Sequence, residues 1–131
     1  MVQVTGLYAA LFALLYIGLA ARIIAVRKRD RVSVGDGASR ELERRIRMHG
    51  NAAEYGPLIL LLMALCEMQA TSAYVIHGFG IALIVGRLLH AFGLAPGDRN
   101  LKARMAGMFL TFSCLAITAL ILLYKGIVGG I

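Results

Sequence analysis

A short run of polar side chains leads directly into an apolar segment, and it holds most of the residues that could do chemistry. The run extends over residues 44–57 and continues into apolar residues 58–65. A carboxamide, Asn51, and a carboxylate, Glu54, are therefore carried toward hydrocarbon on one predicted helix. Charged groups cost about 2.5–3.5 kcal/mol at the centre of a membrane helix, so we expect these groups to have a partner or a function.

Helical periodicity gathers most of these polar side chains on one side of the helix. Each residue turns the helix by about 100°. The shared face carries Arg44, Arg47, Asn51, Glu54 and Tyr55. His49, in the same run, points to the far side. We therefore expect one chemically active face, with His49 turned away from it.

Composition indicates an integral membrane protein that is entirely helical. Of the 131 residues, 60% are hydrophobic, and the charges are gathered between long apolar stretches. A membrane-spanning helix needs about 20 predominantly apolar residues. The pattern predicts a single domain over residues 1–131, an all-α four-helix bundle with transmembrane helices at about 4–28, 39–69, 72–94 and 100–126. The second of these needs its polar first half in order to span.

The distribution of charge predicts an orientation and excludes nucleic acid as a partner. The net charge is +7, and all 14 Lys and Arg residues except Lys125 fall on one side of a four-span arrangement. Cytosolic loops carry such an excess of basic residues. We expect both basic loops in the cytosol, both termini on the opposite side, and the first apolar stretch to be a retained helix.

Counting residues from the turn between the second and third helices predicts which side chains share a depth. Glu54 falls level with Arg87, and Asn51 with His90, while Arg104 lies at a similar height. A salt bridge between Glu54 and Arg87 is one interpretation. The other is a pocket whose surplus guanidinium groups receive a carboxylate-bearing or thiolate ligand.

Other chemistries find little support in the residue pattern. The three His are scattered over two predicted helices, so we expect no metal site. Cys66 and Cys114 lie in apolar helix, where a cysteine is typically a small packing residue rather than a nucleophile.

Two motifs carry a resemblance to a known family. Arg47-x-x-x-Asn51-x-x-Glu54-Tyr55-x-Pro57 resembles the second-helix signature of the membrane-associated proteins in eicosanoid and glutathione metabolism, the MAPEG family. Residues 86–93 are similar to that family's third-helix segment. The resemblance implies a homotrimer of four-helix subunits, with glutathione bound in a cleft between subunits that opens toward the cytosol.

The resemblance also implies roles for individual residues. Glutathione contacts would be Arg47, Asn51, Glu54 and Tyr55, with His49 as a contact drawn from the neighbouring subunit. Arg104 would activate the thiol, acting as the catalytic residue. From the residues themselves, Arg44 could hold a carboxylate, Arg87 could orient Glu54, and His90 shares their depth. The sequence departs from the eicosanoid synthases of the family, which have tyrosines at the positions of His90 and Leu94.

These observations predict a membrane-bound glutathione transferase or peroxidase-like protein. It would add the thiolate of glutathione, its co-substrate, to a lipophilic electrophile that arrives through the bilayer. One alternative is a non-catalytic membrane module that binds an anionic lipid or a partner. Another is a small proton-coupled transporter. Such a transporter needs its glutamate exposed to both sides of the membrane in turn, whereas Glu54 is expected near one face, where nearby arginines would hold it ionised.

Overall fold

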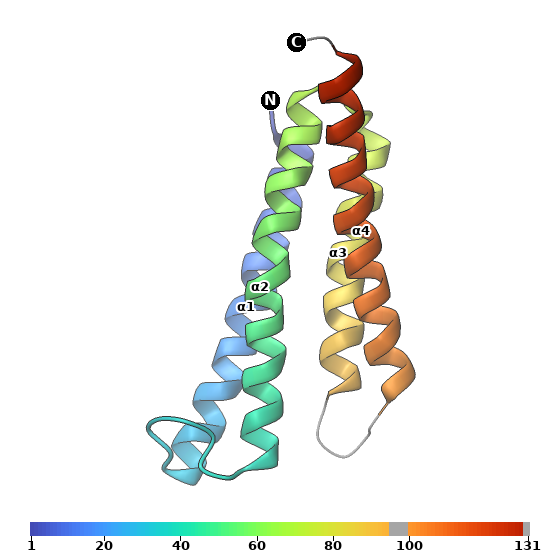
Figure 1. The fold of residues 1–131 in the computed structure, drawn as a ribbon. Coiled ribbons are helices and arrows are strands. Elements are labelled where there is room, and N and C mark those ends of the chain that lie inside the picture. The colour runs from blue at the N-terminus through green and yellow to red at the C-terminus, as the bar shows by residue number, and fades with distance from the viewer. Residues whose placement is uncertain (95–99, 130–131) are drawn as a thin grey trace.

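Four long helices make up the part of the protein that the structure describes. The computed structural model describes residues 1–94 and 100–129, and within them it contains helices and no strand. The helices are α1 (Gln3–Asp30), α2 (Arg40–Met68), α3 (Ala73–Gly93) and α4 (Leu101–Val128). Figure 1 shows them side by side along one axis. Their ends lie within two residues of the boundaries expected from the apolar runs.

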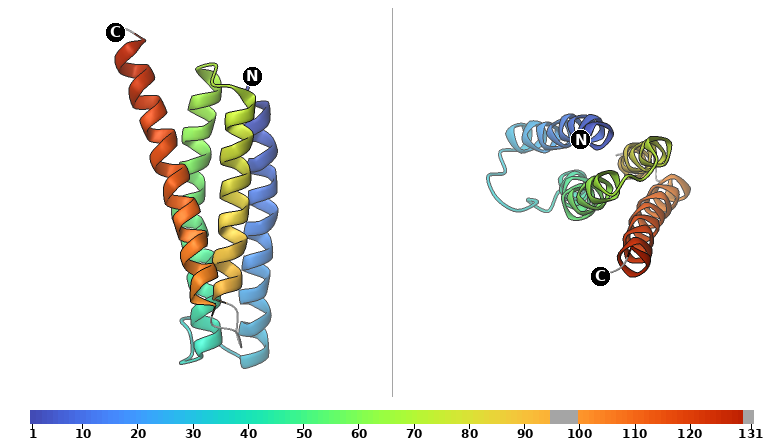
Figure 2. Two further views of the ribbon diagram at one scale, coloured as in Figure 1. Left: turned by 90° about the vertical axis from the view of Figure 1, so that its right-hand side faces the viewer. Right: turned by 90° about the horizontal axis from the view of Figure 1, so that it is seen from above.

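The helices run alternately up and down. The start of α1 and the end of α4 lie at one end of the bundle, whereas the segment between α1 and α2 lies at the other, the same end as the end of α3 and the start of α4 (Figure 1). We call this second end the loop end. Helices α1 and α4 each pack against both α2 and α3, and the described parts of α1 and α4 do not contact each other (Figure 2).

Helix α4 crosses the α2–α3 hairpin obliquely. Near the loop end it packs against α3, where the backbones meet at Gly86 and Gly107. Toward its C-terminal end it approaches α2, because Cys66 Sγ lies 3.7 Å from the carbonyl oxygen of Thr118. Small residues let membrane helices approach closely. Helix α4 therefore packs against α3 near the loop end and against α2 near the opposite end of the bundle.

Aromatic rings of α1 pack directly on glycines of its two neighbours. The ring of Phe12 covers Gly56 of α2, and the ring of Tyr8 covers Gly80 of α3. A Cβ atom at either glycine would overlap the ring above it. The Tyr8 hydroxyl also lies 3.0 Å from Nδ1 of His77. These contacts determine how α1 is rotated against the hairpin.

Local chemistry explains where α2 begins. The Ser39 hydroxyl accepts a hydrogen bond from the Leu42 amide and so caps the N-terminus of the helix. In the first turn Glu41 accepts hydrogen bonds from Arg29 of α1 and from Arg45, one turn further along α2. The two arginines hold the pKa of the Glu41 carboxyl below its ordinary value of 4.5. This partly exposed ion cluster ties the start of α2 to the end of α1.

Within the described residues, three helices are long and apolar enough to cross a membrane: α1, α3 and α4. Helix α2 is as long, but charged residues occupy its first half. Three of the four expected membrane spans are therefore long and apolar enough, and α2 is not among them. Large apolar side chains such as Leu14, Ile17, Phe109 and Leu120 are exposed on the outside of the bundle. Exposed apolar surface of this extent suits contact with lipid. The chain is an integral membrane protein.

Candidate functional site

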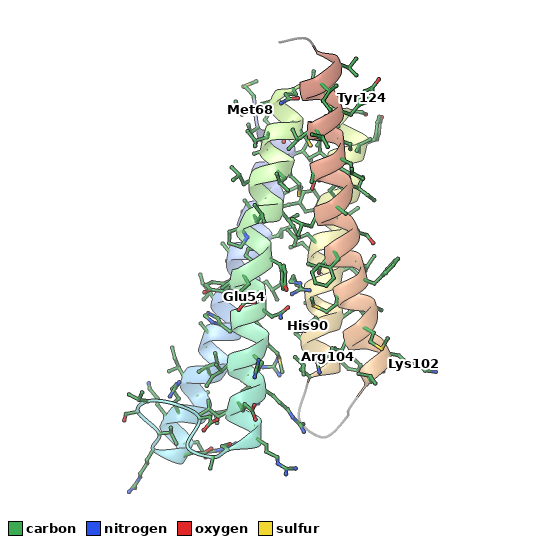
Figure 3. All side chains as sticks on the ribbon, viewed as in Figure 1. Glu54, Met68, His90, Lys102, Arg104 and Tyr124 are labelled. Atoms are coloured by element: carbon green, nitrogen blue, oxygen red, sulfur yellow. The ribbon has the colours of Figure 1, made fainter. Side chains whose placement is uncertain are left out.

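A cleft lies between α2, α3 and α4 near the loop end. Its volume is about 660 Å³, which falls within the range of about 300–1,000 Å³ that is usual for small-molecule sites. Its walls come from all three helices: Glu43, Arg44, Arg47 and Asn51 from α2, His90, Gly93 and Leu94 from α3 and its end, and Leu101 and Arg104 from α4. Figure 3 shows His90 and Arg104 near each other at this end.

The lining of the cleft is rich in positive charge. It contains the guanidinium groups of Arg44, Arg47 and Arg104 and a single carboxylate, that of Glu43. Among the described residues, none of these three arginines forms an ion pair. Guanidinium groups bind carboxylates in bidentate, charge-assisted pairs. The cleft therefore has the donors to receive an anionic molecule.

Close packing of α3 on α4 brings His90 and Arg104 to the same cleft. A Cβ atom at Gly93 would lie 2.5 Å from the Arg104 amide nitrogen, so only glycine allows this approach. One turn earlier in α3, the His90 amide nitrogen would lie 2.6 Å from a Cβ atom at Gly107. Two glycines on opposite helices therefore determine the width of this wall.

Behind the cleft, Arg87 is buried, with 2% of its surface exposed. Its Nη1 donates to Asn51 Oδ1 at 2.9 Å, and its Nη2 donates to the Thr111 hydroxyl. The sulfur of Met108 lies 3.4 Å from the same Nη2. Arg87 thus joins α3 to α2 and α4 through neutral acceptors.

The expected pairing of Arg87 with Glu54 is wrong for the single chain. Glu54 is exposed on the outer side of α2 and does not line the cleft. It shares the angular position of Arg47 but lies about one turn beyond Asn51, nearer the middle of the bundle than His90 (Figure 3). The carboxamide of Asn51 accepts the hydrogen bond that the sequence interpretation gave to the carboxylate.

The other two predicted ligand contacts also lie outside the cleft. Tyr55 is half-buried and meets Phe112 of α4 edge to face, with ring centroids 5.2 Å apart. His49 stacks on Tyr16 of α1 at a centroid distance of 4.2 Å. His49 therefore does point away from the polar face, but its neighbour there is an aromatic ring of its own chain.

The structure thus divides the predicted site residues into three groups. The cleft brings together Arg44, Arg47, Asn51, His90 and Arg104. Arg87 lies immediately behind it. Glu54, Tyr55 and His49 lie elsewhere on α2. Glu43 was not among the predicted site residues, although its spacing of four residues from Arg47 could have placed it on the cleft face.

Comparison with known proteins identifies the family. The model of the MAPEG family matches residues 5–124, nearly the whole chain. The chain belongs to the MAPEG family. The resemblance noted in the second and third helices is thereby confirmed, and the MAPEG match spans all four helices from α1 to α4.

Among curated proteins, this MAPEG protein is similar to the inner membrane protein YecN of Escherichia coli strain K12. The two are 38% identical over 118 residues, which cover 90% of this chain and 88% of the relative. The protein of the same name from Escherichia coli O6:H1 matches to the same extent. No solved structure matches the chain.

Proposed function

We propose that this MAPEG protein is a membrane-bound glutathione transferase or peroxidase-like protein and that the cleft at the loop end binds glutathione. The observation that carries the proposal is the cleft itself, which Asn51 lines together with three guanidinium groups that have no ion-pair partners among the described residues. Glutathione offers two carboxylates to such a site, together with one ammonium group and one thiol.

The lining supplies a group for each part of glutathione. Arg44 and Arg47 are the candidates for the carboxylates, and Glu43 can accept hydrogen bonds from the ammonium group. Arg104 stands on the opposite wall, where it is the candidate for the sulfur. A free thiol has a pKa of about 8.5, and an adjacent cation lowers it, which raises the population of the nucleophilic thiolate.

The chemistry then needs only an electrophile from the lipid. In a conjugation, the thiolate forms a sulfur–carbon bond while a leaving group departs or a proton is taken up at the adjacent carbon. In a peroxide reduction, the thiolate attacks one peroxide oxygen, the oxygen–oxygen bond breaks, and an alcohol leaves. The thiol of a second glutathione then attacks the sulfur of the resulting sulfenic acid, the sulfur–oxygen bond breaks, and water leaves as the disulfide forms. The exposed apolar surface of the bundle gives lipophilic substrates a route to the site.

The surface of α2 supports assembly into a homotrimer. Seven of its exposed or half-exposed positions follow a regular spacing of three and four residues: Arg47, Asn51, Glu54, Leu58, Leu61, Leu65 and Met68. This is the spacing by which helices pack along a seam. Because a carboxylate facing lipid is costly, we propose that this seam packs against a neighbouring subunit. Glu54 would then reach a cleft shared between subunits.

We also propose that the loop end faces the cytosol. The segment between α1 and α2 and the flanking helix ends carry most of the basic residues, as cytosolic regions do. Glutathione would then enter from the cytosol. Single cysteines placed at Ser33 and at Gln3, labelled from outside intact cells with a membrane-impermeant maleimide, test this orientation. Labelling at Ser33 and protection at Gln3 would reverse it.

Glutathione binding to the purified protein is the direct test. By isothermal titration, Arg47→Ala should weaken binding about tenfold to a hundredfold, because a hydrogen bond to a charged group contributes roughly 1.5–3 kcal/mol. Arg40→Ala is the matched control, because Arg40 is exposed on α2 outside the cleft. Glu54→Gln should weaken binding only if the trimer forms. Unchanged glutathione affinity in Arg47→Ala and in Glu54→Gln would show that neither Arg47 nor Glu54 belongs to the site.

The role of Arg104 has its own measurement. Arg104→Ala should lower the ultraviolet thiolate absorbance of bound glutathione at neutral pH, because the thiol pKa would rise without the adjacent cation. Lys102→Ala is the control, since Lys102 lies in the same turn of α4 but outside the cleft (Figure 3). Equal thiolate absorbance in wild type and Arg104→Ala would refute the assignment.

A second candidate is a non-catalytic module that holds an anionic lipid headgroup. The exposure of Arg47, Leu101 and Arg104 at the cleft favours it, since these side chains could contact headgroups as readily as a soluble ligand. Turnover of glutathione with a generic aromatic halide electrophile separates the two. Conjugation above the uncatalysed rate supports the transferase, whereas its absence together with tight binding of anionic phospholipid supports the module.

A further inference from the structure

A chain of hydrogen bonds centred on Arg87 crosses the bundle behind the cleft. The Thr111 hydroxyl donates to the Gly107 carbonyl oxygen at 2.8 Å, one turn earlier in α4. The same hydroxyl oxygen accepts from Arg87 Nη2. Arg87 Nη1 then donates to Asn51 Oδ1 of α2 at 2.9 Å. A hydroxyl has a single proton, so Thr111 can serve Arg87 only as an acceptor while it donates to Gly107.

This chain determines which end of the Asn51 carboxamide faces the cleft. A guanidinium group has only donors, so it must meet the amide oxygen and not the amide nitrogen. The Nδ2 group of Asn51 is then on the other branch of the amide. No hydrogen bond between described residues uses Nδ2, and Asn51 lines the cleft. Asn51 can therefore offer the cleft two N–H donors while its oxygen is engaged.

Burial makes the arrangement rigid. Arg87 and Thr111 are 2% and 0% exposed. Neither can turn toward water for alternative partners, and an unmade hydrogen bond at such a site costs about 1–3 kcal/mol. The guanidinium is also not paired with any carboxylate among the described residues. Its positive charge remains behind Asn51 and favours an anion in front of it.

We propose that Arg87 and Thr111 are positioning residues that make Asn51 an obligate hydrogen-bond donor to a carboxylate of the bound ligand. The inference rests on the proposed function for the identity of that ligand, glutathione. It assigns to Asn51 a donor role that its side chain, taken alone, does not specify, because a free carboxamide can turn either end to a ligand. It also gives Arg87 a task that does not involve Glu54.

The Asn51→Asp variant tests the donor role. It keeps the acceptor toward Arg87 and replaces the cleft-facing donor by an oxygen that repels a carboxylate. Glutathione affinity should fall at least about tenfold, whereas the thermal midpoint should not fall, because the new carboxylate pairs with Arg87. A merely structural role would move stability and affinity together. Affinity equal to wild type in this variant would overturn the proposal.

Thr111 provides a matched pair of variants for the positioning role. Thr111→Val removes the hydroxyl at nearly constant shape and should weaken glutathione binding roughly fivefold, because Arg87 loses one of its two oxygen acceptors. Thr111→Ser retains the hydroxyl and should restore the affinity to within about twofold of wild type. Equal weakening by valine and serine would show that the hydroxyl does not position Asn51.

A measurement without glutathione separates this inference from the proposed function. In protein labelled with ¹⁵N at Asn and Arg side chains, the Asn51 amide protons should exchange quickly with water and the Arg87 guanidinium protons slowly. Slow exchange at Asn51 would refute the assigned orientation, whether or not glutathione binds. If the wild-type protein failed to bind glutathione but the Asn51 amide protons exchanged rapidly, the proposed ligand would be rejected. The inferred orientation of the Asn51 carboxamide would still stand.

Discussion

Replacing Gly107 with alanine tests the close packing on which one wall of the cleft depends. A Cβ atom there would lie 2.5 Å from the Gly86 carbonyl oxygen, 2.6 Å from the His90 amide nitrogen and 3.0 Å from His90 Cβ. Two of these three atoms belong to backbone, which cannot turn aside as a flexible side chain does. The only relief is for α3 and α4 to move apart near the loop end.

The size of the effect follows from those distances. Ordinary carbon contacts begin at about 3.4 Å, so the helices must separate by nearly 1 Å at this level. Overpacking of this kind typically costs about 1–3 kcal/mol. For a chain of this length, such a cost corresponds to a drop in the thermal midpoint of roughly 3–10 °C. Moving α4 also carries Arg104 away from His90, so glutathione affinity should fall with stability.

Gly126→Ala is the control on the same helix, because a Cβ atom at Gly126 has nothing within 4 Å. Alanine there should leave the protein as stable as wild type, or raise its stability by up to about 1 kcal/mol through helix propensity. The assay is thermal unfolding in one detergent at one protein concentration, followed by circular dichroism. If Gly107→Ala were as stable as Gly126→Ala, the inferred contact between α3 and α4 would be wrong.

Three further predictions concern other parts of the fold. Glu67 accepts hydrogen bonds from two amides at the start of α1, so Glu67→Ala should cost about 1–3 kcal/mol, and an unchanged midpoint would contradict this. The pKa of Glu41 is lowered by its arginine partners, so its stabilising effect is complete above pH 4.5 and is lost as pH falls through the lower folded value. The midpoint difference between wild type and Glu41→Gln should therefore disappear in acid, and a difference that persists would contradict the ion cluster. Cys66 and Cys114 are buried thiols and should react with maleimide only after unfolding, which mass spectrometry measures.

The sequence alone determined the helices and the gathering of charge. Long apolar runs specify where helices lie, because backbone groups in hydrocarbon must be satisfied within the segment. Regular spacing specified which side chains share a face of α2. Counting from the turn between α2 and α3 placed Asn51 and His90 at one height, and both line the cleft. These properties depend only on the geometry of one helix or one hairpin.

The partners of these side chains were decided by the tertiary structure. Spacing gave Arg87 and Glu54 the same depth, yet Arg87 bonds Asn51 and Thr111, and Glu54 faces outward. The reason is the rotation of each helix about its axis relative to its neighbours. That rotation depends on the packing of the Phe12 and Tyr8 rings on glycines of α2 and α3, and on the close approach of the α3 and α4 backbones. Such contacts join residues far apart in the chain, so no local pattern specifies them.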